Sequence, residues 1–287
     1  MKVAIIGLGE VGACYAAPLA ELGFDLECCD PAPRDGAVAL AQRLSCPIHT
    51  APGDWLDTCE VVLSCVTGRA SEAVSETWLP LMRAGGVYAD LTTALPETKR
   101  RAAGTAAGYG VSYADVAIMG PISVTGPQTP LLAAGEGAAK FRDLFARFDG
   151  PVEVLDVAAG GAIALKLLRS VFTKGLEALC IEMVLSAEKQ GVRENLFERF
   201  SDMDDIPMKS LLSLLVRTHP THAARRLHEV DDAAAHMTAQ GVPSLTLPGV
   251  RDRFQATVRA LERTPPPSSE MSFDEALAWL TDPGATA

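Results

Sequence analysis

The chain has 287 residues, enough for one large domain or two ordinary ones, and 48% of its residues are hydrophobic. Its net charge of −11 argues against a nucleic-acid or anionic-membrane partner, because both require clustered positive charge. No apolar stretch approaches the roughly 20 residues that span a bilayer, and the short apolar run near the N-terminus leads directly into a glycine turn, unlike a signal peptide.

The first thirty residues predict a strand, a glycine turn, a helix and a second strand that ends in an acid. G-x-G-x-x-G follows the apolar run 3–6, which is typical of a buried parallel strand. The glycines permit the tight bend, the approach of a pyrophosphate, and close packing of helix on strand. Asp30 is placed to accept hydrogen bonds from a ribose 2′-hydroxyl. A turn without a ligand is the alternative, but the spacing favours dinucleotide binding by Gly7, Leu8, Gly9, Glu10, Val11, Gly12 and Asp30.

Further strands alternate with helices along the first half of the chain. We expect them at 47–49, 60–66, 87–91, 111–118, 130–134 and 152–155. This alternation predicts an α/β Rossmann-type fold, a doubly wound parallel sheet, and we assign residues 1–157 to this dinucleotide-binding domain.

From residue 158 onward apolar residues recur at helical spacing, which predicts an all-α C-terminal domain over 158–287. Its first element is a long inter-domain helix over 162–191. Shorter helices are expected at 194–200, 208–217, 221–240, 247–261 and 273–280. The long helix is apolar around most of its circumference, so we expect a second copy of the chain to cover it in a homodimer.

The seven cysteines form an odd set without metal-ligand spacing. They are expected to be small buried residues of a reducing cytoplasm, where we place the protein. His219 and His222 have no carboxylate or thiolate at a suitable spacing, so no metal site is expected.

Lys166 is the strongest candidate for chemistry. Its neighbours on the predicted helix are Ala162, Ile163, Leu167 and Leu168, which makes the common alternative, a solvated surface lysine, a poor fit. A lysine shielded from water has a lowered pKa and can act as a general acid or base near neutral pH.

Four ordered motifs resemble the β-hydroxyacid dehydrogenase superfamily, which contains 3-hydroxyisobutyrate dehydrogenase and 6-phosphogluconate dehydrogenase. They are G-L-G-E-V-G at 7–12, D-L-T-T-x-x-P at 90–96, D-V-A-I-M-G-P at 115–121, and Gly160-Gly161 followed by Lys166. The region beyond about residue 194 resembles a poorly characterised C-terminal domain of phosphogluconate-dehydrogenase-like proteins.

The resemblance implies an NAD(P)-dependent dehydrogenase acting on a secondary alcohol of a small hydroxy acid or related compound. Lys166 is then the proton carrier, and the cofactor lies against Ser64, Cys65, Val66, Thr92 and Thr93. Asp30 favours NAD, because a 2′-phosphate would face a carboxylate, whereas Arg34 keeps NADP possible.

The chain departs from the superfamily where substrate is held. A Ser-Gly-Gly turn is replaced by Met119-Gly120-Pro121, and the asparagine after the lysine by Ser170. Ser123 or Arg169 could supply the missing contacts. In the helical region, His222 or Arg226 could line the substrate pocket, or Thr221 could simply cap a helix with a basic face.

Two other functions remain open. Imine reductases share the scaffold but, as the resemblance implies, usually replace the lysine, so Lys166 weighs against this activity. A non-catalytic NAD(P) sensor is the alternative of another class, and such proteins also tend to lose the lysine.

Overall fold

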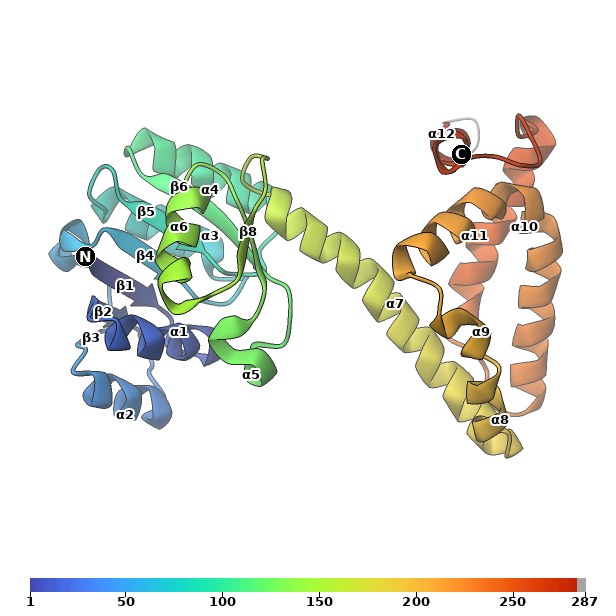
Figure 1. Ribbon diagram of the computed structural model, residues 1–287, viewed down its shortest axis with the longest axis horizontal. Coiled ribbons are helices and arrows are strands. Elements are labelled where there is room, and N and C mark those ends of the chain that lie inside the picture. Colours follow the sequence, from blue (N-terminus) through green and yellow to red (C-terminus); the bar gives the residue numbers. More distant parts are fainter. Residues whose placement is uncertain (283–287) are drawn as a thin grey trace. The chain divides into compact units, whose positions relative to one another are not determined.

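The structure, a computed structural model, describes residues 1–282 and separates into two compact units, Met1–Val171 and the residues from Phe172 onward (Figure 1). The division falls inside the long helix α7 (Gly161–Gln190). The domain boundary after residue 157 stays a prediction.

Unit 1 is an eight-stranded sheet in the order β3-β2-β1-β4-β5-β6-β7-β8, with helices on both faces (Figure 1). The strands are β1 (Lys2–Ile6), β2 (Asp25–Cys29), β3 (Ile48–His49), β4 (Val61–Ser64), β5 (Val87–Asp90), β6 (Ser112–Ile118), β7 (Leu131–Ala134) and β8 (Val152–Val154). The helices are α1 (Glu10–Glu21), α2 (Asp35–Leu44), α3 (Ser71–Trp78), α4 (Pro96–Gly108), α5 (Ile122–Thr125) and α6 (Ala138–Phe145). The expected Rossmann-type α/β fold is confirmed.

Alternating strand residues build the two halves of the core. Val3 and Ile5 pack on the face covered by α1, α2 and α6, whereas Ala4 and Ile6 pack on the face covered by α3 and α4. Because both faces are covered, β1 is a continuous apolar run rather than an alternating one.

The sheet is not parallel throughout. β7 pairs antiparallel with β6, and β8 runs parallel to β7, so the last two strands are reversed relative to the other six. The expectation of parallel strands here was wrong. Only short helical turns, α5 and Gly126–Gln128, lie between β6 and β7, so this link lacks the long helix that usually makes the crossover of a parallel pair.

Chain order reverses between β2 and β4, which lie on either side of β1. In open α/β sheets, ligands bind beyond the carboxyl ends of the strands at such a reversal. The glycine turn follows β1 at this point, so the topology positions the candidate site.

Unit 2 is helical. It contains the C-terminal part of α7 and the helices α8 (Arg193–Glu198), α9 (Ser201–Asp204), α10 (Met208–Ala239), α11 (Leu247–Arg263) and α12 (Phe273–Thr281). Both α11 and α12 pack against α10. Within residues 1–282, no helix is long and apolar enough to cross a membrane.

The sequence predicted two helices where α10 is continuous, and this prediction was wrong. Pro220 lies buried inside α10. A proline there lacks the N–H for one helix hydrogen bond, and packing against α11 and α12 outweighs that cost. Thr221 therefore caps no helix, and its hydroxyl instead donates to the Ser269 carbonyl at 3.2 Å.

Candidate functional site

The glycine turn has the shape that a pyrophosphate requires. Gly7 has φ of +86°, and a Cβ on Gly12 would lie 2.0 Å from the Gly7 carbonyl oxygen, so the helix can approach the strand only with glycine there. A Cβ on Gly9 would have nothing within 4 Å. Among the described residues, no side chain caps α1, which leaves its N-terminus to face an anion.

Asp30 is tied to this turn. Its carboxylate accepts the Leu8 N–H at 2.9 Å and the Ala32 N–H at 3.0 Å, which holds it at the end of β2 beside the loop. Arg34 is exposed just before α2, whereas Glu10 is exposed and Val11 half-buried at the start of α1. These positions fit a dinucleotide.

Close backbone packing joins the turns that follow three neighbouring strands. A Cβ on Gly7 would lie 2.9 Å from the Cys65 carbonyl oxygen, and one on Gly68 would lie 2.5 Å from that of Thr93. Lys166 Nζ then donates to Thr93 Oγ1 at 3.1 Å. The glycine turn, the end of β4, the D-L-T-T turn and Lys166 therefore form one contiguous site in unit 1.

The remaining cofactor candidates line the same strand ends. Ser64 is buried at the end of β4, and Cys65 and Val66 are half-buried directly after it. Thr92 is buried, and among residues 1–282 its hydroxyl has no hydrogen-bond partner. Thr93 is exposed and borders an open pocket of about 680 Å³ together with Arg69 and Glu72.

Lys166 lies in an electrostatic setting suited to proton transfer. Partial burial, and secondarily the positive charge of Lys99, lower its pKa from the ordinary value of 10.5. Ser170, one turn further along α7, donates its hydroxyl to the Lys166 carbonyl at 2.9 Å. Ser170 thus bonds within the helix.

A buried ion pair that sequence reasoning missed supports this site. Lys99 is fully buried on α4, with Nζ 2.8 Å from Asp115 Oδ1 and 3.9 Å from Asp90 Oδ1. Asp90 Oδ1 in turn accepts the Thr92 N–H at 2.8 Å. Lys99 therefore holds the acid that shapes the D-L-T-T turn.

The second acid of this group starts the helix that carries Lys166. Asp115 Oδ2 accepts the N–H groups of Gly160 at 2.9 Å and Ile163 at 3.2 Å, where α7 begins. Asp115 thus positions α7. The sequence signals for this network were the acids Asp90 and Asp115 at the start of two motifs, and the placement of Lys99 on the same helical face as Ala102 and Ala106, which are buried.

The substrate candidates are only partly brought together. The Met119 N–H donates a hydrogen bond to the Pro130 carbonyl at 2.8 Å. The Met119 carbonyl accepts a hydrogen bond from the Arg169 guanidinium at 3.3 Å. Gly120 is half-buried, and Pro121 and Ser123 are exposed around the start of α5. All of these residues belong to unit 1, with Lys166.

His222 and Arg226 belong to unit 2. His222 borders a polar pocket of about 490 Å³ with Arg217, and Arg226 donates to Thr218 Oγ1 at 3.0 Å. Their role toward substrate stays a prediction. In the part of the chain that the structure describes, no group of three His, Cys, Asp or Glu side chains is arranged to hold a metal ion.

Comparison with known proteins identifies the two parts of the chain. Residues 2–142 match the NAD binding domain of 6-phosphogluconate dehydrogenase, and residues 187–257 match a domain of unknown function, DUF1932. The N-terminal part is therefore similar to the NAD-binding domain of 6-phosphogluconate dehydrogenase. The superfamily resemblance drawn from the motifs is confirmed.

The chain is also similar to known proteins along nearly their whole length. An uncharacterised 28.5 kDa protein of Methanothermus fervidus is 23% identical over 89% of this chain and 98% of its own. A solved protein of unknown function with structural similarity to 3-hydroxyacid dehydrogenases is 25% identical, with a TM-score of 0.63 over 90% of this chain and 98% of its own. An imine reductase from Aspergillus terreus, solved with NADPH4, is 20% identical, with a TM-score of 0.76 over 96% of this chain and 97% of its own. This last likeness shows a shared fold.

Proposed function

We propose that the protein is an NAD(P)-dependent oxidoreductase that transfers a hydride between the nicotinamide and a secondary alcohol of a small hydroxy acid or related compound. The observation that carries the proposal is the 3.1 Å hydrogen bond from Lys166 Nζ to Thr93, in a turn contiguous with the glycine loop. A lysine that is partly shielded from water at this point can accept the hydroxyl proton of an alcohol as the hydride leaves.

Each part of the site has a role in this reaction. The glycine turn and the N-terminus of α1 would hold the pyrophosphate, and Asp30 the adenosine ribose. The nicotinamide supplies the hydride donor or acceptor. Neutral Lys166 accepts the hydroxyl proton during oxidation, and protonated Lys166 returns it during reduction. Thr93 orients the lysine through their hydrogen bond.

For the cofactor, we propose a preference for NAD. The Asp30 carboxylate lies beside the glycine turn, bonded to the Leu8 N–H, where a 2′-phosphate would meet negative charge. Arg34 is exposed and could offset this charge, so titrations of NADH and NADPH, followed by nicotinamide fluorescence, decide between the two.

Imine reduction is the second candidate, supported by the fold shared with the Aspergillus terreus enzyme. It requires a proton donor beside the imine nitrogen, which protonated Lys166 could provide. The two activities differ in substrate, so one panel of hydroxy acids, their keto forms and cyclic imines distinguishes them.

We also propose a homodimer formed through the helical unit and a cytoplasmic location. The dimer is supported by large apolar side chains exposed on that unit, among them Ile181 and Leu185. The location is supported by the seven cysteines, all of which are free thiols in the described residues.

The decisive experiment compares the wild-type chain with Lys166→Ala on this panel. We expect turnover to fall roughly 10²- to 10⁴-fold, as on removal of a general acid or base, while NADH binding is retained. Lys174→Ala, at an exposed position of the same helix, is the matched control. Turnover of Lys166→Ala within threefold of wild type would exclude the proposed mechanism, and NADH binding without turnover on any substrate would favour the sensor.

A further inference from the structure

Two cysteines in unit 1 lie in contact beside the cofactor site. The Sγ atoms of Cys28, on β2, and Cys46, just after α2, are 2.9 Å apart. Both side chains are buried, at 1% and 8% exposure, and both are free thiols. No other pair of cysteine sulfurs makes such a contact among the described residues.

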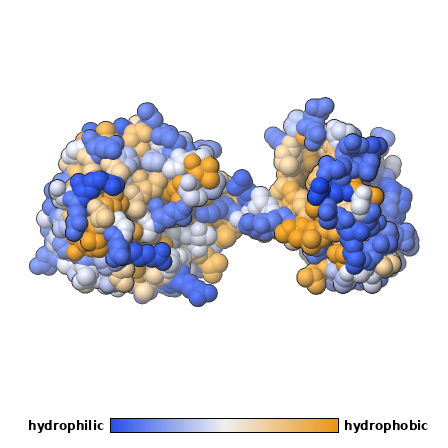
Figure 2. All heavy atoms as spheres, turned by 90° about the horizontal axis from the view of Figure 1, so that it is seen from below, coloured by the Kyte–Doolittle hydropathy of each residue, from blue (hydrophilic) through white to orange (hydrophobic). Residues whose placement is uncertain are grey.

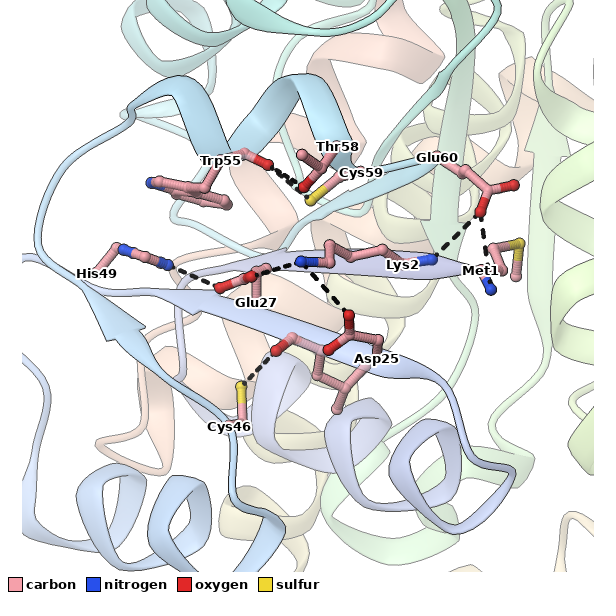
Figure 3. Close-up of polar contacts among 11 residues, drawn as sticks. Met1, Lys2, Asp25, Glu27, Cys46, His49, Trp55, Thr58, Cys59 and Glu60 are labelled. Carbon is pink, nitrogen blue, oxygen red and sulfur yellow. Dashed lines mark hydrogen bonds and ion pairs between the residues drawn. The ribbon is translucent and has the colours of Figure 1, made fainter.

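The backbone holds this pair in place. Cys28 donates its N–H to the Pro47 carbonyl at 3.1 Å, and Cys28 lies opposite Ile48 in the β2–β3 pairing. Cys46, two residues before Ile48, has its sulfur on the same sheet face as Cys28. The Cys46 thiol donates a hydrogen bond to the Leu26 carbonyl of β2, with an Sγ–O distance of 3.3 Å (Figure 3).

We propose that Cys28 and Cys46 are an oxidisable dithiol, which a hydroperoxide converts to an intramolecular disulfide that fastens the end of α2 and the edge strand β3 to β2. The Cys46 thiolate first attacks the peroxide, forming a sulfenic acid and releasing water or an alcohol. The Cys28 sulfur then attacks Cys46 and expels water. Two thiols lose two electrons and two protons, and the peroxide is reduced.

Cys46 is the sulfur that reacts first. It is the more exposed of the two and lies at the sheet edge, beside a strand of only two residues. The hydrogen bond with Cys28 lowers the pKa of the Cys46 thiol and raises that of Cys28, and burial raises both. Cys46, at the sheet edge, is therefore the sulfur that a peroxide in solution reaches first.

The Cys28–Cys46 disulfide would restrain the end of β2, which carries the proposed ribose ligand Asp30. Asp30 lies two residues after Cys28, and its N–H donates to the His49 carbonyl at 3.0 Å, on the edge strand. The S–S bond of a disulfide is about 2.05 Å long. The two sulfur atoms, now 2.9 Å apart, therefore have to approach each other by less than about 1 Å. Oxidation is thus expected to stabilise unit 1 and leave the position of Asp30 intact.

The full-length protein is treated with hydrogen peroxide and digested without reduction. We expect a loss of 2 Da per chain, a peptide linking Cys28 to Cys46, and a rise in Tm of roughly 5 °C that dithiothreitol reverses. Cys46→Ser should abolish both the link and the Tm rise. Cys29→Ser is the matched control, because Cys29 packs on the opposite face of the sheet and its loss should leave both intact.

The digest of the wild-type chain is independent of how the variants fold. If both thiols remain free after peroxide treatment, or if the only product is a sulfinic or sulfonic acid, the proposal is wrong. A link that instead involves Cys29, or exposed Cys180 between two chains, would also overturn it.

Discussion

At the scale of single residues, Lys166 is held in a state that differs from a surface lysine. Burial opposes its charged form, and the cation of Lys99 adds to this effect, so its pKa is below the ordinary 10.5. Thr93 accepts a hydrogen bond from Nζ and does not add a counter-charge. A neutral amine is therefore reached at lower pH than for a lysine in water.

This environment predicts opposite pH dependences for the two reaction directions. Oxidation needs neutral Lys166, so kcat/KM should rise with pH and level off above the pKa of the lysine, at a midpoint below 10.5. Reduction needs protonated Lys166, so its rate should fall through the same midpoint. Profiles in both directions test this, and a midpoint at or above 10.5 would show that the surroundings do not disfavour the charged amine.

At the scale of elements, one buried ion pair connects α4, β6 and the start of α7. Asp115 lies 2.8 Å from Lys99 Nζ and also caps α7, so Asp115→Ala would leave a buried cation without its nearest partner. We expect the free energy of unfolding to fall by about 3 to 5 kcal/mol in urea titrations. Glu97→Gln removes an exposed pair with Arg100 and should cost under about 1 kcal/mol.

The double variant Lys99→Met with Asp115→Asn removes both charges and should recover part of that stability, because neither charge remains buried without its partner. Equal losses from Asp115→Ala and Glu97→Gln would mean that the buried pair contributes nothing beyond an exposed one.

In unit 2, His219 makes the packing of α10 against α11 sensitive to pH. Its ring bonds Thr257 Oγ1 at 2.8 Å, and burial, aided by Arg253 and Arg226, lowers its pKa from 6.5 to about 4. Between these values the unfolded chain binds a proton that the folded chain does not. Stability should therefore fall as pH drops from 6.5 to 4 and then level off, by no more than roughly 1 to 2 kcal/mol because solvent screens the partly exposed ring.

Urea titrations of the wild-type chain and of His219→Gln across this range measure the effect. The glutamine cannot titrate, so its stability should change less with pH. Parallel curves for the two proteins would show that His219 carries no such linkage.

What the sequence could predict at this scale follows from how local each signal is. Strand positions and the glycine turn are encoded by neighbouring residues, and the structure confirms the turn; its hydrogen bond from the Leu8 N–H to Asp30 was not predicted. The antiparallel β7 and the passage of α10 through Pro220 depend on packing with distant segments. The Lys99–Asp115 pair is equally non-local, because its members lie 16 positions apart in the chain, one on a helix and the other on a strand.

At the scale of the whole molecule, the exposed apolar surface of the helical unit indicates a protein–protein interface. The C-terminal part of α7 exposes Ile181 and Leu185 at 54% and 55%, and α8 exposes Phe197 at 50%. An apolar pocket of about 430 Å³ in the same unit is lined by side chains such as Leu179 and Met183. Figure 2 shows hydrophobic side chains gathered on this unit. Soluble monomers rarely leave so much apolar surface uncovered.

A second copy of the chain is the partner we predict, and Ile181→Glu tests it. A charge placed within the shared apolar surface has to be buried without a counter-ion, so it should shift the chain toward monomer. Light scattering at micromolar concentration should give twice the chain mass of 30.3 kDa for wild type and a value near 30.3 kDa for the variant. Leu22→Glu, at an exposed position of unit 1, should remain dimeric. A wild-type mass of 30.3 kDa would contradict the predicted dimer, because the apolar surface would then be exposed in a monomer.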